Sequence, residues 1–399
     1  MKNSNITKTT LIAVIVLLIT GFTTTVKEDI KIPEVTKHDG IYYLTIDGKT
    51  PFAKGYQHGV ALKEVIQKSM IDFDTWVISN SDYKNSKEMA TDFIQKTNYL
   101  QDVKTFTPDL YSELTGMAEG SDVDLKTLFL YNSFDEYIAF LMEHKPSIEQ
   151  IAHCTTTGVF GRTDKPNFVT HNNDLMLIFS NKVVVSKIID TEKKVEIMQT
   201  SFAGIFAQNG VNNYGVAVGC NILVDLERNH NGLPVAFNNR KILETKNIQE
   251  AKEYLQSVPS AQAMNYMIGD RDKVISFEVT GNGNVYDVSN FQEGYTVHTN
   301  HTLNKNANKV RDITSTQPST AKTVERLEKA ASVLAENHQT ITTQGIKNLK
   351  STKPIRINEE GSITQTIESV IMEIPKTGKP ILYVTNGLPN GDNYVKFEF

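Results

Sequence analysis

The residue pattern changes character at Cys154. Before it, apolar segments with helical spacing dominate, such as "TPDLYSELTGMAEGS" and "VDLKTLFLYNSFDEYIAFLMEH". After it come short runs rich in Val, Ile, Phe and Tyr, separated by Gly, Asn and Asp, among them "FVTHNN", "KVVVSKII", "GIFAQ", "GVAVGCNILV" and "KVISFEVTG". We therefore expect a helical segment, residues 26–153, followed by a β-rich segment, residues 154–399.

Helical patterns interrupt these strands at "PVAFNNRKILE", "NIQEAKEYLQSV" and "TAKTVERLEKAASVLAEN". Groups of strands and helices in this order, without a linker or a repeat, are typical of a layered α+β domain with largely antiparallel sheets. Near the N-terminus, "IYYLTI" predicts a strand, and "PFAKGYQHG" predicts a turn that leads into a helix starting near Val60.

The first thirty residues have the features of a secretory signal peptide. Lys2 and Lys8 precede an uncharged stretch from Leu11 to Phe22, whose continuous apolar run ends at Ile19. That run is too short to span a bilayer comfortably and fits the apolar region of a signal peptide. We expect residues 1–25 to direct export to a periplasmic or extracellular location, with the segment either removed or retained as a signal anchor. Its cleavage position stays open.

The charge balance argues against several classes of partner. Loss of residues 1–25 would remove two lysines and change the formal net charge from −5 to −7. A mildly acidic surface disfavours nucleic acid and anionic membranes as main partners. We therefore expect a small-molecule partner and no stable membrane contact beyond the signal segment, while a homo-oligomer stays open.

The chain has two cysteines, and their surroundings differ. Alternation places Cys220 on one face with Val216, Val218 and Ile222, which predicts a core residue. Cys154 is followed instead by three threonines. If the peptide bond before Cys154 were cut, the freed α-amino group, with a pKa of about 7.7–8.0, would be a base attached to the nucleophile. In an exported protein, a Cys154 to Cys220 disulfide in a non-catalytic binding protein is the alternative.

Two further residues suit the same chemistry. Asp174, in "THNNDL", lies at a distance along the chain that allows a hairpin to return it to Cys154. There its carboxylate would hold the new ammonium. The alternative role of Asp174 is in an Asx turn at the end of a strand. Asn300, in "VHTNHT", carries an amide that can donate to an oxyanion, although Asn-x-Thr is also a glycosylation sequon.

A metallohydrolase is the remaining alternative. His298 and His301 lie three residues apart, and on a strand such residues point to opposite faces, which is poor geometry for one ion. We therefore predict no metal site and no cofactor.

Taken together, the motifs resemble a known family along nearly all of the exported chain. They are similar, in the same order, to motifs of the acyl-coenzyme A:isopenicillin N acyltransferase family of autoproteolytic N-terminal nucleophile hydrolases, related to penicillin V acylase, bile salt hydrolase and acid ceramidase. The motifs are "PFAKGYQHG", "AHCTTT", "HNND", "GVNNYGVAV", "VHTNH" and "RINEEG". The resemblance implies a four-layer αββα sandwich.

The resemblance also implies roles for individual residues. It implies a precursor cut between His153 and Cys154, with Cys154 as the nucleophile. Asp174 matches the Asp that contacts the freed amine, and Asn300 matches the Asn that helps to form the oxyanion hole. Arg356 of "RINEEG" matches an active-site Arg.

The sequence departs from the family pattern at two positions near Cys154. His171 stands where acid ceramidase and bile salt hydrolase have an Arg, and His153 stands where the penicillin enzyme has a Gly. An imidazole holds a thiolate differently from a permanent guanidinium, and self-cleavage after His153 is therefore an open expectation. We assign His171 and Asn173 to substrate binding.

The expected activity is hydrolysis of an N-acyl amide through a Cys154 thioester. Because acyl-coenzyme A is cytosolic, an exported enzyme should mainly use water as the acyl acceptor. N-Acyl amino acids, β-lactam side chains, N-acyl lactones and conjugated bile acids are the substrate classes we expect. The alternative is an acyltransferase of the same fold.

Overall fold

The computed structural model describes residues 30–144, 153–289, 294–310, 318–358 and 364–399. The predicted signal peptide, residues 1–25, lies outside them. No helix in these ranges is both long and apolar enough to cross a membrane.

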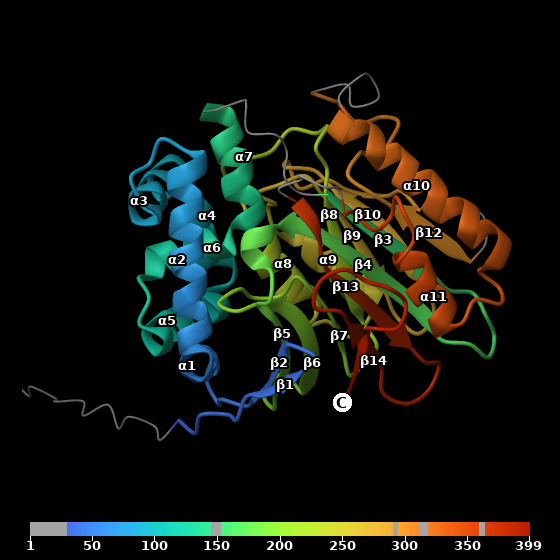
Figure 1. Ribbon diagram of the computed structural model, residues 1–399, viewed down its shortest axis with the longest axis horizontal. Coiled ribbons are helices and arrows are strands. Elements are labelled where there is room, and N and C mark those ends of the chain that lie inside the picture. The colour runs from blue at the N-terminus through green and yellow to red at the C-terminus, as the bar shows by residue number, and fades with distance from the viewer. Residues whose placement is uncertain (1–29, 145–152, 290–293, 311–317, 359–363) are drawn as a thin grey trace, which may run out of the picture.

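In the described residues, two sheets form the centre of the protein (Figure 1). The larger sheet has nine strands and the smaller has six. Every strand pairing is antiparallel except that of β2 with β5. The larger sheet runs in the order β1 (Thr36–His38), β2 (Ile41–Ile46), β5 (Val183–Asp190), β6 (Val195–Phe202), β7 (Asn209–Asn212), β8 (Ala217–Ile222), β9 (Met264–Gly269), β10 (Val274–Val279) and β11 (Val285–Asp287). The smaller runs in the order β12 (Tyr295–His298), β3 (His153–Val159), β4 (Asn167–Met176), β13 (Thr364–Ile374), β14 (Ile381–Val384) and β15 (Val395–Glu398).

The two sheets pack face to face, with β3 and β4 against β8 and β9, and helices cover both outer faces. On the larger sheet, α8 (Val235–Ile242) and α9 (Ile248–Ser257) cover β8, β9 and β11. On the smaller sheet, α10 (Pro318–Asn337) and α11 (Thr343–Lys350) cover β12, β3 and β13. This is the predicted four-layer αββα arrangement, because each sheet buries one face against the other sheet and one against helices.

The N-terminal helices form a group beside the larger sheet (Figure 1). Their bounds are α1 (Pro51–Ala61), α2 (Lys63–Asn80), α3 (Ser86–Lys96), α4 (Tyr99–Phe106), α5 (Pro108–Ser121), α6 (Leu125–Asn132) and α7 (Phe134–His144), and a short 3₁₀ turn follows β4 at Leu177–Phe179.

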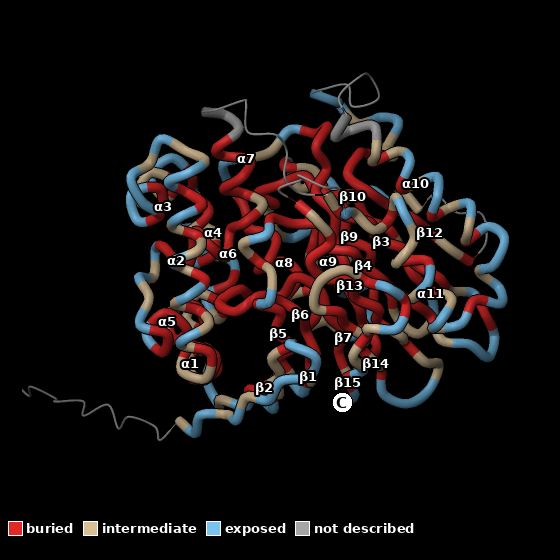
Figure 2. The backbone as a smooth tube through the Cα atoms, viewed as in Figure 1, coloured by how far each residue is buried: buried red, intermediate tan, exposed pale blue. Residues whose placement is uncertain are grey.

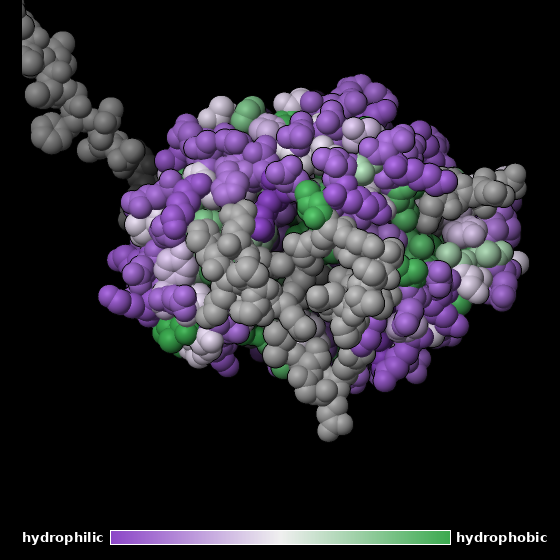
Figure 3. Space-filling model, turned by 90° about the horizontal axis from the view of Figure 1, so that it is seen from above, coloured by the Kyte–Doolittle hydropathy of each residue, from purple (hydrophilic) through white to green (hydrophobic). Residues whose placement is uncertain are grey.

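The two segments predicted on either side of Cys154 share one hydrophobic core (Figure 2). Phe129 of α6 packs against Phe237 of α8 with ring centroids 6.2 Å apart, and Tyr131 packs against Phe179 at 5.8 Å. The outer surface seen in Figure 3 is mostly hydrophilic, with small separate apolar patches. Two fragments made by a cut before Cys154 would therefore each expose a large apolar surface if they separated, so we expect them to stay associated.

Three local predictions were wrong. Helix α1 begins at Pro51 rather than near Val60, because the Thr50 hydroxyl caps it by accepting the Ala53 N–H and proline suits the first helical position. The segment predicted as one helix after residue 122 is divided at Ser133 into α6 and α7. The segment "GIFAQ" is a turn rather than a strand.

Two hydrogen bonds of the Asn132 side chain account for the division of the helix and for the turn at "GIFAQ". The Asn132 side chain donates to the Gly204 carbonyl at 2.7 Å and accepts from the Phe206 N–H at 2.9 Å. The turn is bonded at Gly204 and Phe206 to the end of α6, and Gly204 has a positive φ of 89° that suits a turn. A tertiary contact of this kind overrides the local pattern of both segments.

Candidate active site

Cys154 lies at the start of β3, between β12 and β4 of the smaller sheet. Strands β3 and β4 form the hairpin predicted from the sequence, with His153 opposite Asp174 and Cys154 opposite Asn173. Thr156, two residues after Cys154, bonds through its hydroxyl to Asn221 of β8 at 2.6 Å. Because alternate residues of a strand share a face, the Cys154 side chain points toward the larger sheet.

Side chains replace strand pairing around the first residues of β3. Strand β12 pairs with β3 only as far as His298 opposite Thr156. Beyond that point the Cys154 N–H donates to Asn300 Oδ1 at 2.8 Å, the Arg326 guanidinium donates to the Cys154 carbonyl, and Lys350 Nζ donates to the Thr155 carbonyl at 2.7 Å. The backbone at the predicted cut is therefore held by three side chains.

Asn300 is oriented by two donors. Its Oδ1 accepts from the Cys154 N–H and from Arg326 Nη2, each at 2.8 Å, while its Nδ2 donates to the Ile222 carbonyl at 3.2 Å. A flipped amide would place an NH₂ group against two donors, so the assignment is determined by the hydrogen bonds. In this uncut chain Asn300 therefore holds the nitrogen of the predicted scissile bond, and its amide N–H is directed away from Cys154. Its side chain is buried, which does not suit the glycosylation alternative.

Arg326, on α10, is a site residue that the sequence did not identify. It is fully buried and donates to three acceptors, the Cys154 carbonyl, Thr155 Oγ1 at 2.8 Å and Asn300 Oδ1. Burial lowers its pKa, while the negative charges of Asp174 and Cys154 raise it. The sequence did contain one indication that Arg326 is buried: it falls on the same helical stripe as Ala330 and Leu334, which are core residues.

Asp174 is buried beside the predicted cut, and one of its carboxylate oxygens is left over. Thr366 donates its hydroxyl to Oδ1 at 2.5 Å, whereas Oδ2 has no hydrogen-bond partner among the described residues. Burial raises the pKa of Asp174 to about 7, against the lowering effects of Arg326, Thr366 and Lys350. An additional cation next to Oδ2 would therefore be stabilised by this carboxylate.

The thiol itself is protonated at rest. Burial raises the pKa of Cys154 well above its usual value, and the negative charges of Asp174 and Asp135 raise it further, whereas Arg326 lowers it. Burial also lowers the pKa of His153 to about 3, so its imidazole is neutral at physiological pH. Cys154 and Cys220 are both free thiols, and the Asn239 side chain donates to Cys220 Sγ at 3.4 Å. The structure thus contains no disulfide between them.

The other predicted site residues lie close by but make different contacts. His171 Nδ1 bonds to Asn209 Oδ1 at 2.5 Å, and burial lowers the pKa of His171 to about 3. Asn173 donates to Glu368 Oε2 at 2.8 Å. Both are buried between the sheets.

In the described residues, Arg356 is not among the side chains that bond to the backbone around Cys154. Among the described residues, its guanidinium makes no hydrogen bond or ion pair with Cys154, Asp174 or Asn300, and its Nε is buried without a partner. The adjacent Ile357 N–H bonds to the hydroxyl of Thr366, which in turn bonds to Asp174. Arg356 is therefore the chain neighbour of the residue that bonds to Thr366, and Thr366 is the donor to Asp174.

Glu278 of β10 fixes the turn that carries Asn300. One carboxylate oxygen accepts from His298 Nε2 at 2.9 Å and from the Leu303 N–H at 2.6 Å, and the other accepts from the Thr302 hydroxyl. Burial raises the pKa of Glu278, but these donors outweigh it and hold the pKa below its usual value. One buried carboxylate therefore ties together both ends of the turn 298–303.

We expect Glu278→Gln to lower the free energy of unfolding by about 3 kcal/mol, because it removes the charge that three buried donors were arranged around. Urea denaturation followed by circular dichroism measures the change. Glu328→Gln, an exposed position on α10, is the matched control and should change stability by no more than about 0.5 kcal/mol. Equal stability of the two variants would contradict this role for Glu278.

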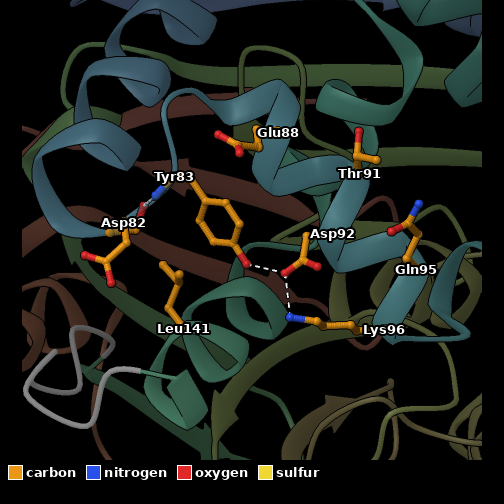
Figure 4. A pocket seen from close by; sticks show the side chains of 9 residues that line it. Asp82, Tyr83, Glu88, Thr91, Asp92, Gln95, Lys96 and Leu141 are labelled. Atoms are coloured by element: carbon orange, nitrogen blue, oxygen red, sulfur yellow. Dashed lines mark hydrogen bonds and ion pairs between the residues drawn. The ribbon is translucent and has the colours of Figure 1, made fainter.

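A metal site and a surface cavity are the two alternatives to the site around Cys154. Within the described residues, no group of three or more His, Cys, Asp and Glu side chains could hold a metal ion. A cavity of about 650 Å³ lies among the end of α2, α3 and α7 (Figure 4). There Asp92 accepts from the Tyr83 hydroxyl and pairs with Lys96 at 2.9 Å, so these lining groups bind one another.

Comparison with known proteins shows similarity to one family. The model of the family described as acyl-coenzyme A:6-aminopenicillanic acid acyl-transferase matches residues 161–384, more than half of the chain. The matched range contains Asp174, Asn300 and Arg326 and begins after Cys154. The 40 kDa form of acyl-coenzyme A:6-aminopenicillanic-acid-acyltransferase from Emericella nidulans is 29% identical over 263 residues, which cover 65% of this chain and 69% of that protein.

Solved structures with detectable similarity include two hydrolases. One is the Caenorhabditis elegans ortholog of N-acylethanolamine-hydrolyzing acid amidase, with a TM-score of 0.41, 15% identity, and coverage of 56% of this chain and 94% of that chain. The other is a mutant of the conjugated bile acid hydrolase from Clostridium perfringens, with a TM-score of 0.43, 14% identity, and coverage of 61% and 92%.

Proposed function

The chain belongs to the acyl-coenzyme A:6-aminopenicillanic acid acyl-transferase family, and from this premise we propose that it is an exported amidohydrolase that cuts itself before Cys154 and then cleaves N-acyl bonds of small molecules. The family match confirms the resemblance found in the sequence motifs. The cut, the substrate class, the role of each site residue and the location are the proposed parts.

The observation that carries the proposal is the unpaired oxygen of Asp174. Asp174 lies opposite His153 across the hairpin, and within the part of the chain that the structure describes its buried Oδ2 has no hydrogen-bond partner. A buried polar atom without a partner costs about 1–3 kcal/mol. A cut before Cys154 releases an ammonium beside this strand position, and that ammonium would supply the missing partner. The uncut site therefore has a place for a group that exists only after cleavage.

Self-cleavage follows from the groups around the bond. Cys154 Sγ attacks the carbonyl carbon of His153, the bond to Cys154 N breaks, and the nitrogen takes up a proton to become the α-amine. Water then hydrolyses the thioester, which leaves a carboxylate on His153 and a free thiol on Cys154. Asn300 and Arg326 hold the Cys154 backbone during these steps, since they bond to its N–H and its carbonyl.

Substrate turnover repeats the same chemistry with an external amide. The Cys154 thiolate attacks the acyl carbon, the α-amine passes a proton to the leaving nitrogen, and water hydrolyses the resulting thioester. A donor role for Asn300 toward the oxyanion requires its amide to turn, because its N–H now bonds to Ile222. If the freed amine of Cys154 moved to Asp174, Asn300 would lose one of the two contacts that fix its present orientation.

Acyl transfer is the second candidate. The matched family and the Emericella nidulans relative are both described as acyltransferases. Transfer and hydrolysis share the Cys154 thioester and differ only in whether an amine or water attacks it. Export would favour water, because acyl-coenzyme A is cytosolic.

Intact-mass measurement of the purified full chain under denaturing conditions tests the cut, and product analysis tests the reaction. We expect two fragments, one beginning Cys-Thr-Thr, and release of free acid and amine from at least one member of a panel of N-acyl amino acids, penicillins, N-acyl lactones and conjugated bile acids. A new amide formed from an acyl-coenzyme A and 6-aminopenicillanic acid would favour the transferase. An uncut chain without turnover on either panel would refute the proposal.

A further inference from the structure

Lys350, at the end of α11, is a fully buried lysine at the nucleophile strand. Its Nζ donates to the Thr155 carbonyl at 2.7 Å, and its own carbonyl accepts from Asn172 Nδ2 at 2.9 Å. These contacts attach α11 to β3 and to β4, on either side of the hairpin that presents Cys154. A lysine is almost never fully buried unless its charge is compensated, so its position here calls for a physical reason.

The charges around Lys350 come from three elements of the fold. Asp174 of β4 and Cys154 of β3 stabilise its ammonium, while Arg326 of α10 repels it. Burial is the larger effect and lowers the pKa of Lys350 to about 7. Burial also raises the pKa of Asp174 to about 7, so below that pH Lys350 and Arg326 are charged while much of Asp174 is neutral, and this buried group carries a net positive charge. Ionisation of the Cys154 thiol would reduce that positive charge.

Resting on the function proposed above, we propose that Lys350 is a positioning residue for the Cys154 chemistry: it anchors the backbone next to the nucleophile and supplies positive charge that favours the Cys154 thiolate. Lys350 takes no part in bond making. It acts through Thr155, whose carbonyl it holds, and through its electrostatic coupling to Cys154.

This coupling has a defined pH range. The thiol of Cys154 also senses Asp174, Cys220 and Asp135, which disfavour the thiolate, and Arg326, which favours it. Lys350 adds to the effect of Arg326 only while it is protonated, and therefore below a pH of about 7. Above that pH Lys350 loses its proton and its support of the thiolate disappears, while Arg326 stays charged.

The test is the rate of alkylation of Cys154 by iodoacetamide between pH 5 and 9, measured by mass spectrometry of its peptide. The uncut chain and the fragment beginning at Cys154 are quantified separately. We expect Lys350→Met to react about tenfold more slowly than the wild type below pH 7, which corresponds to one pKa unit, with a difference that vanishes as the pH rises above 7. Lys350→Arg should keep the fast rate and, above pH 7, exceed the wild type.

The control is Lys347→Met, which removes a partly exposed lysine from the same helix and should follow the wild type at every pH. A ratio between wild type and Lys350→Met that does not change with pH would overturn the proposal, since a purely structural role slows alkylation uniformly. If Lys350→Met does not fold, equal rates for Lys350→Arg and wild type above pH 7 would overturn it as well. A wild type that stays uncut and inactive would refute the proposed function, but the alkylation profiles would still decide the role of Lys350.

Discussion

A Cys154→Ala variant is expected to remain a single uncut chain and to lose amide turnover by a factor of about 10³ or more. Cys154 lies at the start of β3 with its carbonyl and N–H already fixed by Arg326 and Asn300. Alanine retains these backbone contacts but has no sulfur to attack the His153 carbonyl. The loss of cleavage and turnover should therefore come from the missing sulfur, while the fold stays intact.

Intact mass and initial rates with the best amide of the panel measure this outcome. Cys220→Ala is the matched control, because Cys220 is the other buried thiol and bonds only to groups of the core around Asn239. It should be cut and should turn over substrate like the wild type. Cleavage of Cys154→Ala to the same extent as the wild type would show that another group or another protease cuts the chain.

The sequence was sufficient to predict the hairpin that forms one side of the site. The three threonines after Cys154 are β-branched, "FVTHNN" suits a return strand, and the spacing allows a hairpin that brings Asp174 back near Cys154, as the structure shows. The layered architecture followed from the order of strands and helices. These features depend on local patterns and on short connections, which a single sequence records well.

The cations at the site could not be predicted in the same way. Arg326 and Lys350 lie on α10 and α11, far along the chain from Cys154, and their positions follow from how those helices pack on the smaller sheet. A positive side chain on a helix is normally solvated, and the helical stripe that Arg326 shares with Ala330 and Leu334 indicates burial but not which groups the guanidinium meets. The motif "RINEEG" pointed instead to Arg356, which the fold leaves outside the contacts of Cys154.

The orientation of the Asn300 side-chain amide could not be predicted from the sequence either. An amide carries both donors and an acceptor, and the choice between them depends on the partners that the fold supplies. Here two donors converge on its oxygen, from β3 and from α10. The same residue was predicted from its motif, but its present contact is with the backbone nitrogen of Cys154 rather than with an oxyanion.

Replacement of Arg326 by methionine is expected to slow self-cleavage and amide turnover by about 10²-fold. The guanidinium donates to the Cys154 carbonyl, to Thr155 Oγ1 and to Asn300 Oδ1, all of them buried. Methionine has a similar length and packs well in a core, but it leaves the Cys154 carbonyl and Thr155 Oγ1 without this donor, at a cost of about 1–3 kcal/mol each, whereas Asn300 Oδ1 keeps the Cys154 N–H. It also removes the cation that lowers the pKa of the Cys154 thiol and of Asp174.

Three measurements separate these effects: the rate of self-cleavage, the pH profile of turnover, and urea denaturation. With the cation removed, the pKa of both groups rises, so the acid limb of the pH profile should move to higher pH. Arg326→Lys, which restores a positive charge but not the three-way contact, should return the acid limb toward the wild-type position while cleavage stays slow. Lys329→Met, an exposed change on the same helix, should behave like the wild type. A stable Arg326→Met chain that is cut and active at the wild-type rate would mean that the backbone of Cys154 needs no buried cation, and that Asn300 alone holds the site.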